Sequence, residues 1–380
     1  MGVTDPLRVL ALEPFYGGSH RAFLDGWANH SAHAWTILGL PDHAWKWRMR
    51  HSAWTFAQQV ARRAAQGESW DVLFASDMLP LAELRGLAPP SAARLPAIVY
   101  FHENQLTYPV REEHERDLHF ALTNLITAGS ADAVWFNSQF HHDDFLNAAE
   151  TFLRRMPDHQ PLEVMTAIRN KAAVQWPGID SSGAPTEHRD GPLHIVWAAR
   201  WEHDKNPEDF FAALNQLIAA GVDFQVSVLG QSFREVPPVF AEYASKLSGR
   251  IVHWGYQDTR GAYQSALQSA DVFVSTAQHE FFGLAAVEAM AAGCFPLLPR
   301  RLAYPELVTD SDGVVHDQFL YDGTVDGLAA RLQELARKKR QRTLPLATAA
   351  ELAARCHWPA RAPKLDKALR QTWEAASRHA

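Results

Sequence analysis

The feature that most constrains the fold of this chain is an alternation of short apolar runs with longer helical segments. Seven runs have the length of buried strands: 35–38, 72–75, 97–101, 133–137, 195–198, 224–229 and 272–275. Helical stretches lie between them, at 52–65, 117–127, 207–220 and 260–268. This alternation predicts doubly wound parallel sheets of the α/β class. In such sheets, ligands bind beyond the carboxyl ends of the strands.

The length of the chain, 380 residues, suits two domains of ordinary size. Residues 178–192 combine glycine, proline, serine and charged residues without apolar periodicity, which predicts a linker. We therefore expect an N-terminal domain over 1–177 and a C-terminal domain over 193–357. Hydrophobic residues make up 47% of the chain, which is enough for two separate cores.

Charge and cysteine content limit the classes of protein. A net charge of −7 excludes a chain that binds nucleic acid through overall basic charge, so any such contact requires a local patch. Cys294 and Cys356 provide no disulfide framework and favour a reducing compartment. Because no apolar run has the roughly 18 residues of a membrane span and residues 7–12 form a strand instead of a signal peptide, we expect a cytoplasmic protein without a membrane partner.

Two carboxylates eight positions apart follow the apolar run 271–276. Glu280 precedes a turn that contains Phe282 and Gly283, and Glu288 lies in the helical run that begins with Leu284 and Ala285. A strand, a glycine turn and a helix together offer backbone N–H groups to a phosphate. Glu280 is placed to bind hydroxyls beside that phosphate, and Glu288 to bind a ribose. The spacing predicts a nucleotide-sugar site; the alternative is a structural helix with two solvated glutamates.

Two cations follow the run 195–198. Arg200 and Lys205 are five positions apart, and Pro207 opens the next helix. Together they would neutralise a leaving diphosphate, a role that metal ions perform in other transferases. The alternative is an ordinary solvated pair of charges.

Polar residues also follow strands of the first half. A Gly-Gly turn at Gly17 and Gly18 allows a ligand to approach the backbone closely, although an ordinary strand-to-helix turn has the same pattern. Polar side chains directly after a buried strand are unfavourable unless they bind something. Such a cluster comprises His102, Glu103, Asn104 and Gln105.

Three further residues follow strands and are expected to line the donor pocket, with a purely structural role equally compatible with the pattern: Ser138, Gly230 and Tyr256. The residues His141-His142-Asp143-Asp144 are of types that bind metal ions. Adjacent residues of a helix point in different directions, however, so these four side chains cannot share one metal ion. No His-Glu-x-x-His or paired-cysteine motif is present. We therefore predict no metal site and no metal cofactor.

One segment suggests the acceptor. Aromatic and basic residues interleave over 45–51, where Trp47, Arg48 and Arg50 could stack on bases and hold phosphates. The alternative is the start of a surface helix whose tryptophans pack inward. A second basic run, 337–342, is equally compatible with a solvated helix end.

Four motifs together resemble the tRNA-queuosine α-mannosyltransferase family: FYGGSH at 15–20, KWRMR at 46–50, YFHENQL at 100–106 and RWEHDKNP at 200–207. The resemblance implies the GT-B fold of retaining family 4 glycosyltransferases, with two Rossmann-like domains and a last helix, 358–380, that returns to the first domain. A turn at Trp358-Pro359 and a helix over 363–378 fit that return. The family resemblance further implies GDP-mannose as donor and queuosine in the anticodon of tRNA-Asp as acceptor.

The same resemblance implies roles for individual residues. His102 contacts the transferred sugar, Arg200 and Lys205 hold the diphosphate, and Glu280 binds sugar hydroxyls. The residues expected to bind the acceptor here are His20, Glu103, Asn104 and Gln105. The expected reaction is front-face transfer with retention of configuration. One alternative is a GT-B enzyme that uses another nucleotide sugar and a lipid or small-molecule acceptor; another is an inactive nucleotide- or tRNA-binding module. The sequence indicates no oligomeric state.

Overall fold

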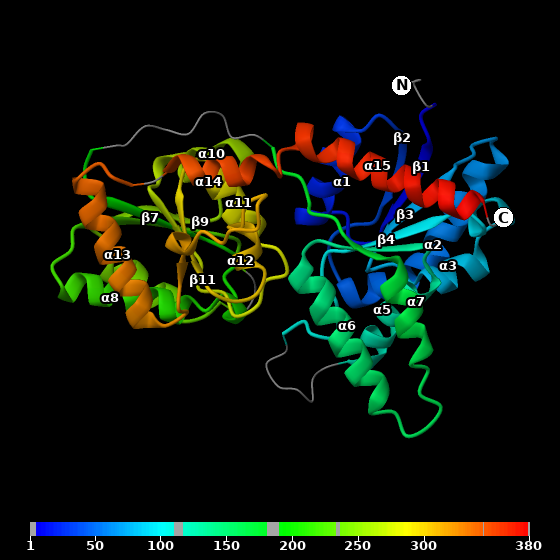
Figure 1. Ribbon diagram of the computed structural model, residues 1–380, viewed down its shortest axis with the longest axis horizontal. Helices are drawn as coiled ribbons and strands as arrows, with labels where there is room; N and C mark the ends of the chain where they lie inside the picture. Colours follow the sequence, from blue (N-terminus) through cyan, green and yellow to red (C-terminus); the bar gives the residue numbers. More distant parts are fainter. Residues whose placement is uncertain (1–4, 110–116, 181–189, 233–235, 345, 379–380) are drawn as a thin grey trace. The chain divides into compact units, whose positions relative to one another are not determined.

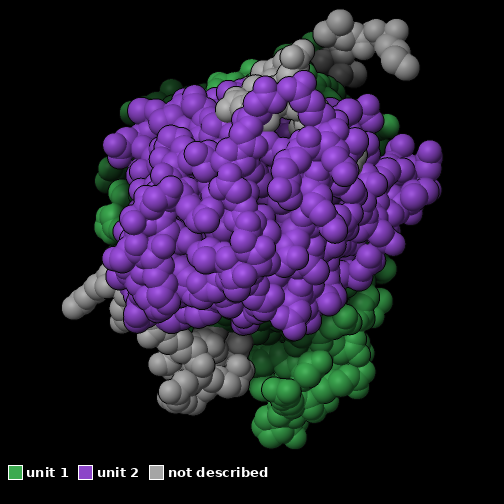
Figure 2. Space-filling view, turned by 90° about the vertical axis from the view of Figure 1, so that its left-hand side faces the viewer, with its two compact units in different colours: residues 1–178, 358–380 green, residues 179–357 purple. Residues whose placement is uncertain are grey.

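The computed structural model describes residues 5–109, 117–180, 190–232, 236–344 and 346–378. The chain forms two compact units, coloured separately in Figure 2. Unit 1 comprises residues 1–178 together with 358–380, and unit 2 comprises residues 179–357. Of the linker predicted at 178–192, residues 181–189 lie outside the described residues.

Unit 1 is built on a parallel sheet with helices around it (Figure 1). Its elements, in chain order, are β1 (Arg8–Glu13), α1 (Gly18–His30), β2 (Ala34–Gly39), α2 (Trp45–Ala65), β3 (Val72–Ser76), α3 (Leu81–Leu87), α4 (Pro90–Ala93), β4 (Ala97–Phe101), α5 (Leu118–Ser130), β5 (Ala133–Phe136), α6 (Gln139–Arg154), α7 (Glu163–Lys171), β6 (Ala172–Val174) and α15 (Trp358–Ser377). The strand order is β2-β1-β3-β4-β5-β6, and every pairing is parallel.

The core of unit 1 lies on both faces of this sheet. Every residue of β3 and β4 is buried, as expected for parallel strands covered on both sides. Successive residues alternate between two apolar clusters, one of which includes Leu73 and the other Phe74. Helix α15 supplies Trp358 and Leu365 to the second cluster and runs beside α1 (Figure 1). The last helix is thus part of the core of unit 1.

The strand order of unit 1 reverses beside β1. The chain passes from β1 outward to β2 and then returns to the opposite side of β1 to form β3. The loops leaving the carboxyl ends of β1 and β3 therefore diverge, which opens a crevice where α/β proteins bind ligands. Glu13 ends β1 and Ser76 ends β3, so both residues lie at this crossover.

Unit 2 repeats this plan with its own sheet (Figure 1). Its elements are β7 (Leu193–Ala198), the 3-10 helix η2 (His203–Lys205), α8 (Pro207–Ala219), β8 (Phe224–Leu229), α9 (Val239–Lys246), β9 (Ile251–Gly255), α10 (Arg260–Ser269), β10 (Val272–Val274), α11 (Leu284–Ala291), β11 (Phe295–Pro299), α12 (Tyr304–Leu307), the 3-10 helix η3 (Asp317–Phe319), β12 (Leu320–Tyr321), α13 (Val325–Arg340) and α14 (Leu346–Ala354). The parallel order β12-β11-β10-β7-β8-β9 places the crossover between β7 and β10.

The α/β prediction is confirmed, and the seven predicted strands are present. Two boundaries were wrong. Helix α2 begins at Trp45 instead of residue 52, and Trp358 begins α15 instead of forming a turn. Pro359 fits there because the first residues of a helix need no hydrogen-bond donor.

The basic run 337–342 ends α13 and is largely paired within unit 2. Lys339 is buried against Asp271, Lys338 lies 2.7 Å from Glu334, and Arg342 lies 2.6 Å from Asp190. Lys339 therefore has a structural role, whereas the ion pairs of Lys338 and Arg342 lie at the surface. In the part of the chain that the structure describes, no helix combines the length and apolar character needed to cross a membrane.

Candidate functional site

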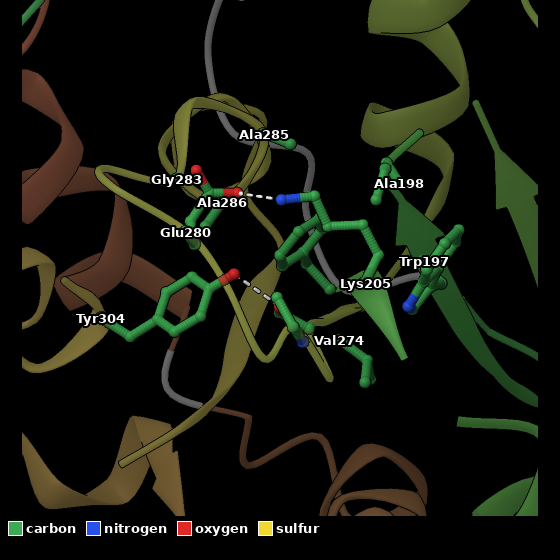
Figure 3. Close-up of a pocket in the computed structure, with 13 residues that line it drawn as sticks. Trp197, Ala198, Lys205, Val274, Glu280, Gly283, Ala285, Ala286 and Tyr304 are labelled. Atoms are coloured by element: carbon green, nitrogen blue, oxygen red, sulfur yellow. Dashed lines mark hydrogen bonds and ion pairs between the residues drawn. The ribbon is translucent and has the colours of Figure 1, made fainter. Parts of the chain in front are cut away.

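A pocket lies at the β7/β10 crossover of unit 2, where the sequence predicts the nucleotide-sugar site (Figure 3). It is formed by the ends of β7 and β10, the start of α11 and one residue of α12. The lining residues are Trp197, Ala198, Ala199, Lys205, Phe273, Val274, Ser275, Ala277, Glu280, Gly283, Ala285, Ala286 and Tyr304. The structure thus brings Lys205 into one pocket with Glu280 and Gly283, which lie far from it in the sequence.

Lys205 is the fixed cation of this pocket. It ends the short helix η2, and its Nζ donates to the carbonyl of His279 at 2.8 Å. The same Nζ lies 3.4 Å from Glu280 Oε2 and 3.1 Å from Asp204 Oδ2, as Figure 3 shows for Glu280. Burial alone would lower the pKa of Lys205, but the carboxylates of Glu280 and Asp204 raise it. The ammonium therefore stays charged at neutral pH.

Gly283 shapes the anion-binding end of the pocket. Its φ of +98° lies in the left-handed region, and a Cβ there would approach Tyr304 Cε1 to 3.1 Å. Glycine is therefore the residue this turn requires. The first backbone hydrogen bond of α11 runs from Ala286 to Gly283, so the N–H groups of Leu284 and Ala285 precede it. Such a helix start attracts anions such as phosphates. The side chain of Phe282, which the sequence placed at the donor site, is buried.

Tyr304 is a pocket residue that the sequence analysis missed. Its hydroxyl lies 2.6 Å from Ser275 Oγ (Figure 3). Burial, followed by the charge of Glu280, raises the pKa of Tyr304 well above its usual value, so the hydroxyl keeps its proton. No pattern around residue 304 signals this position, because only the fold brings α12 to the pocket.

Glu288 lies on α11, after the residues Ala285 and Ala286 that line the pocket. Its Oε1 pairs with Arg260 at 2.6 Å, and its side chain is 17% exposed. Burial, followed by the charge of Glu288 and a hydrogen bond to it, raises the pKa of Tyr263. Arg260 and Tyr263, both on α10, were not predicted. Glu288 is thus a held carboxylate whose remaining acceptor positions suit the hydroxyls of a ribose.

Three further predicted residues of unit 2, Arg200, Gly230 and Tyr256, lie after strands of its sheet. Arg200 is about half exposed and pairs with Glu202 at 3.2 Å. At Gly230, with φ +152°, an added Cβ would lie 1.8 Å from the carbonyl oxygen of Ala199, so the backbones after β7 and β8 approach as closely as glycine permits. Tyr256, beyond β9, is 64% exposed and available to a ligand.

Unit 1 has a buried polar cluster at its own crossover. The rings of His20 and His102 stack with centroids 4.0 Å apart and planes inclined by 27°. Glu13 Oε2 lies 3.2 Å from His20 Nδ1. These three side chains place one ligand atom each within 4.8 Å of one another. Nearly parallel rings direct their in-plane lone pairs along separate lines, however, so the arrangement suits an ion pair better than a metal ion.

Several predicted residues of unit 1 have structural partners. Gly17 precedes α1, and a Cβ on it would meet the carboxylate of Asp42 at 1.9 Å; Gly18 opens the helix. Asn104 is buried and its Oδ1 accepts from the N–H of Thr107, which closes the loop after β4. Ser138 is buried and caps α6 through His141 N at 2.9 Å.

Beside Asn104, Glu103 Oε1 accepts from Gln105 Nε2 at 3.2 Å. Gln105 is nearly buried, whereas Glu103 is only half-buried. Of the three polar side chains after His102, Glu103 is therefore the most available to a ligand.

The predicted acceptor segment forms the first turns of α2. Trp47 and Trp54 lie seven residues apart on one face and are 61% and 66% exposed. Arg50 lies between them in sequence, with its guanidinium 4.5 Å from the ring centroid of Phe120. Arg48 is instead buried and donates to the carbonyl of Pro41 at 3.0 Å. The exposed α2 surface is thus Trp47, Arg50 and Trp54.

Solved structures share this arrangement of sheets. Sucrose-phosphate synthase from Thermosynechococcus elongatus matches with a TM-score of 0.73 and 16% identity over 97% of this chain and 100% of its own. HepE of Anabaena, in complex with UDP and glucose, matches with a TM-score of 0.63 and 16% identity over 97% and 99%. The model of group 1 glycosyl transferases matches residues 180–371. The protein is therefore a glycosyltransferase with the GT-B fold.

The sequence relatives define the family. The model of the tRNA-queuosine α-mannosyltransferase N-terminal region matches residues 8–179. The tRNA-queuosine α-mannosyltransferase of Drosophila melanogaster is 40% identical over 314 residues, which are 79% of this chain and 81% of the fly protein. The chain belongs to the tRNA-queuosine α-mannosyltransferase family.

A more distant relative matches about half of the chain. It is the GDP-mannose-dependent α-(1-6)-phosphatidylinositol dimannoside mannosyltransferase of Mycobacterium tuberculosis, 28% identical over 197 residues, which are 51% of this chain and 48% of the relative.

Proposed function

We propose that this glycosyltransferase moves mannose from GDP-mannose to queuosine in the anticodon of tRNA-Asp, with retention of configuration. Support for the acceptor comes from the family, whose fly member is named for tRNA-queuosine. Support for the donor comes from the mycobacterial relative, which is named as GDP-mannose-dependent. Lys205 and the start of α11 add support, because a cation and a helix N-terminus both attract a diphosphate.

The observation that carries the proposal is the placement of Lys205 and Glu280 in the pocket at the start of α11. A buried ammonium and a helix N-terminus converge where a diphosphate would sit, and a carboxylate lies 3.4 Å from that ammonium. Charge that develops on a leaving diphosphate is stabilised most by groups that are already in place. Arg200, whose side chain is 44% exposed, adds a second cation, which is close enough for its charge to act on Lys205.

In this reaction Glu280 binds hydroxyls of the sugar, and Glu288 binds the ribose. His102 of unit 1 contacts the transferred sugar. The leaving phosphate accepts the proton of the acceptor hydroxyl, so no side chain acts as general base. Lys205 and Arg200 supply the positive charge, and no step requires a metal ion.

The α2 surface (Trp47, Arg50 and Trp54) is proposed to contact the RNA. Exposed indoles offer faces on which unpaired bases stack, and Arg50 adds a charge for the phosphate backbone. A local patch of this kind is what an acidic chain needs to bind tRNA. Arg48, which is buried, supports the start of this helix.

Transfer of labelled mannose from GDP-mannose to tRNA-Asp, with and without queuosine, tests the proposal. Label on the queuosine-containing tRNA alone would support both donor and acceptor. UDP-mannose and GDP-glucose serve as matched donors that change the base or the sugar separately. Bound GDP-mannose without labelled tRNA would refute the acceptor, and absence of GDP-mannose binding would refute the donor.

A further inference from the structure

A buried ion pair lies beneath the histidine that the proposed function assigns to the sugar. Glu13 and His20 are 1% and 8% exposed, and they meet at the β1/β3 crossover of unit 1. His20 lies face to face with His102, the first residue after β4. Neither Glu13 nor His20 is explained by the donor pocket.

Glu13 is fixed in place by the backbone and by its neighbouring strand. Its Oε1 accepts from Phe15 N at 2.9 Å and from Ser76 Oγ at 3.0 Å. The second oxygen, Oε2, lies 3.2 Å from His20 Nδ1, an ion-pair contact without hydrogen-bond geometry. Because Oε1 accepts two hydrogen bonds, the carboxylate has one orientation, and its charge lies beside the imidazole.

His102 is fixed by packing on several sides. Its ring lies 4.0 Å from His20, 4.7 Å from Tyr100 and 5.3 Å from Phe23 between centroids. Its backbone N–H donates to Asp77 Oδ1 at 2.9 Å. Among the described residues, no hydrogen-bond partner reaches its buried Nε2. Packing against these three rings therefore holds the imidazole of His102.

We propose that Glu13 and His20 are positioning residues for His102: the carboxylate holds His20 as an imidazolium, and the stacked cation keeps His102 uncharged and in one orientation. The link to sugar transfer rests on the proposed function. A sugar that leaves a diphosphate gains positive charge in the transition state. An uncharged imidazole tolerates that charge, whereas an imidazolium at the same place would repel it.

Charged and titratable groups from several elements face the rings of His20 and His102. Burial alone would lower the pKa of His20, but Glu13 of β1, Asp77 after β3 and Glu103 after β4 raise it to about 9. Burial, then the charge of His20 and that of His141 on α6, lower the pKa of His102 well below its usual value. One ring is thus charged and the other neutral across the physiological range.

Nuclear magnetic resonance of histidine-labelled protein tests the charge states directly. Long-range ¹H–¹⁵N spectra, assigned with His20→Gln and His102→Gln, should show at about pH 7 a doubly protonated His20 and a neutral His102. In Glu13→Gln the midpoint of His20 should fall by about two pH units, because the attracting charge is lost, and that of His102 should rise. Glu13→Asp, which keeps the charge, should restore most of both shifts.

Asp366→Asn is the matched control. It removes a carboxylate of unit 1 that accepts from Trp27 Nε1 at 2.8 Å and is not among the charges that shift the pKa of either ring, so both midpoints should stay unchanged. A neutral His20 at about pH 7 in the wild type, or unchanged midpoints in Glu13→Gln, would overturn the proposal.

The transfer assay tests the catalytic consequence. Glu13→Gln should lower kcat about tenfold and move the acid limb of its pH profile upward, with the KM for GDP-mannose unchanged. Glu13→Asp should recover kcat. If the spectra show the predicted charge states but Glu13→Gln leaves the pH profile of kcat unaltered, the positioning role is overturned. Absence of transfer by the wild-type enzyme would refute the proposed function, while the spectra would still decide the charge states.

Discussion

Removal of the Lys205 ammonium gives the sharpest test of the donor site. Lys205→Met keeps an unbranched side chain of similar length and deletes only the charge. The ammonium donates hydrogen bonds to the carbonyl of His279 and to Glu280 Oε2, and it also contacts the carboxylate of Asp204. The substitution therefore affects stability and turnover at once, and the two effects must be separated.

Both magnitudes follow from this environment. One preorganised charge-stabilising donor at a reacting centre typically contributes about 10²–10³ in kcat, or roughly 3–4 kcal/mol. The substitution also leaves two carboxylates close together without their cation. Breaking a buried ion pair in this way costs about 3–5 kcal/mol of stability; because Glu280 is about a quarter exposed, solvent screening places the expected loss below that range.

A second buried lysine in the same unit supplies the control. Lys339 is only 6% exposed and pairs with Asp271, which is 8% exposed, but it lies outside the donor pocket. Lys339→Met should therefore lower the unfolding free energy at least as much as Lys205→Met and leave kcat near the wild-type value. Urea unfolding measures the first quantity, and labelled-mannose transfer at saturating GDP-mannose measures the second.

Two results would refute the assignment of Lys205. One is a folded Lys205→Met enzyme whose kcat is within about threefold of wild type. The other is an equal loss of kcat in both variants, which would show that the effect arises from destabilised unit 2. If the assignment is right, Lys205→Arg, which keeps the charge, should retain more activity than Lys205→Met.

Four further outcomes are expected. Gly230→Ala should lower the unfolding free energy by more than about 1 kcal/mol, measured by urea unfolding, because its Cβ would meet the carbonyl of Ala199 at 1.8 Å; an unchanged midpoint would contradict this contact. Trp47→Ala should raise the KM for tRNA about tenfold without changing the KM for GDP-mannose, because an exposed indole would stack on a base; equal changes in both constants would argue against the α2 surface. Excess EDTA should leave the transfer rate unchanged, and a loss restored by Mg²⁺ would show that a metal takes part. Burial and Lys205 lower the pKa of His279 to about 4, so between that value and 6.5 the unfolded chain binds more protons and stability falls as the pH falls; His279→Gln should give a flatter profile of urea midpoint against pH than the wild type.

Much of the fold could be predicted because its strands are buried on both faces. Such strands are nearly continuous apolar runs, as in 97–101, where every residue is buried. The start of α2 was missed because Ala44, its N-cap, adopts φ +53° and offers no capping side chain. Strands β6 and β12, with three and two residues, are too short to carry a pattern.

The candidate donor site was predictable where its residues follow strands. Lys205 and Glu280 come after β7 and β10, and a parallel sheet brings those two ends together. Tyr304 and Arg260 were missed because they reach the site only through tertiary packing. The burial of His20 depends on Glu13, seven residues earlier, and on His102, from another strand, so no local pattern reveals it.

The return of α15 to unit 1 sets the order in which the chain can fold during synthesis. Trp358 packs so tightly against Gly26 that a Cβ there would come within 2.2 Å of its indole nitrogen, and Trp27 donates to Asp366. On the ribosome, where the N-terminus emerges first, residues 179–357 are complete before this helix exists. Unit 2 can thus reach its native state while unit 1 still exposes the apolar surface that α15 will cover.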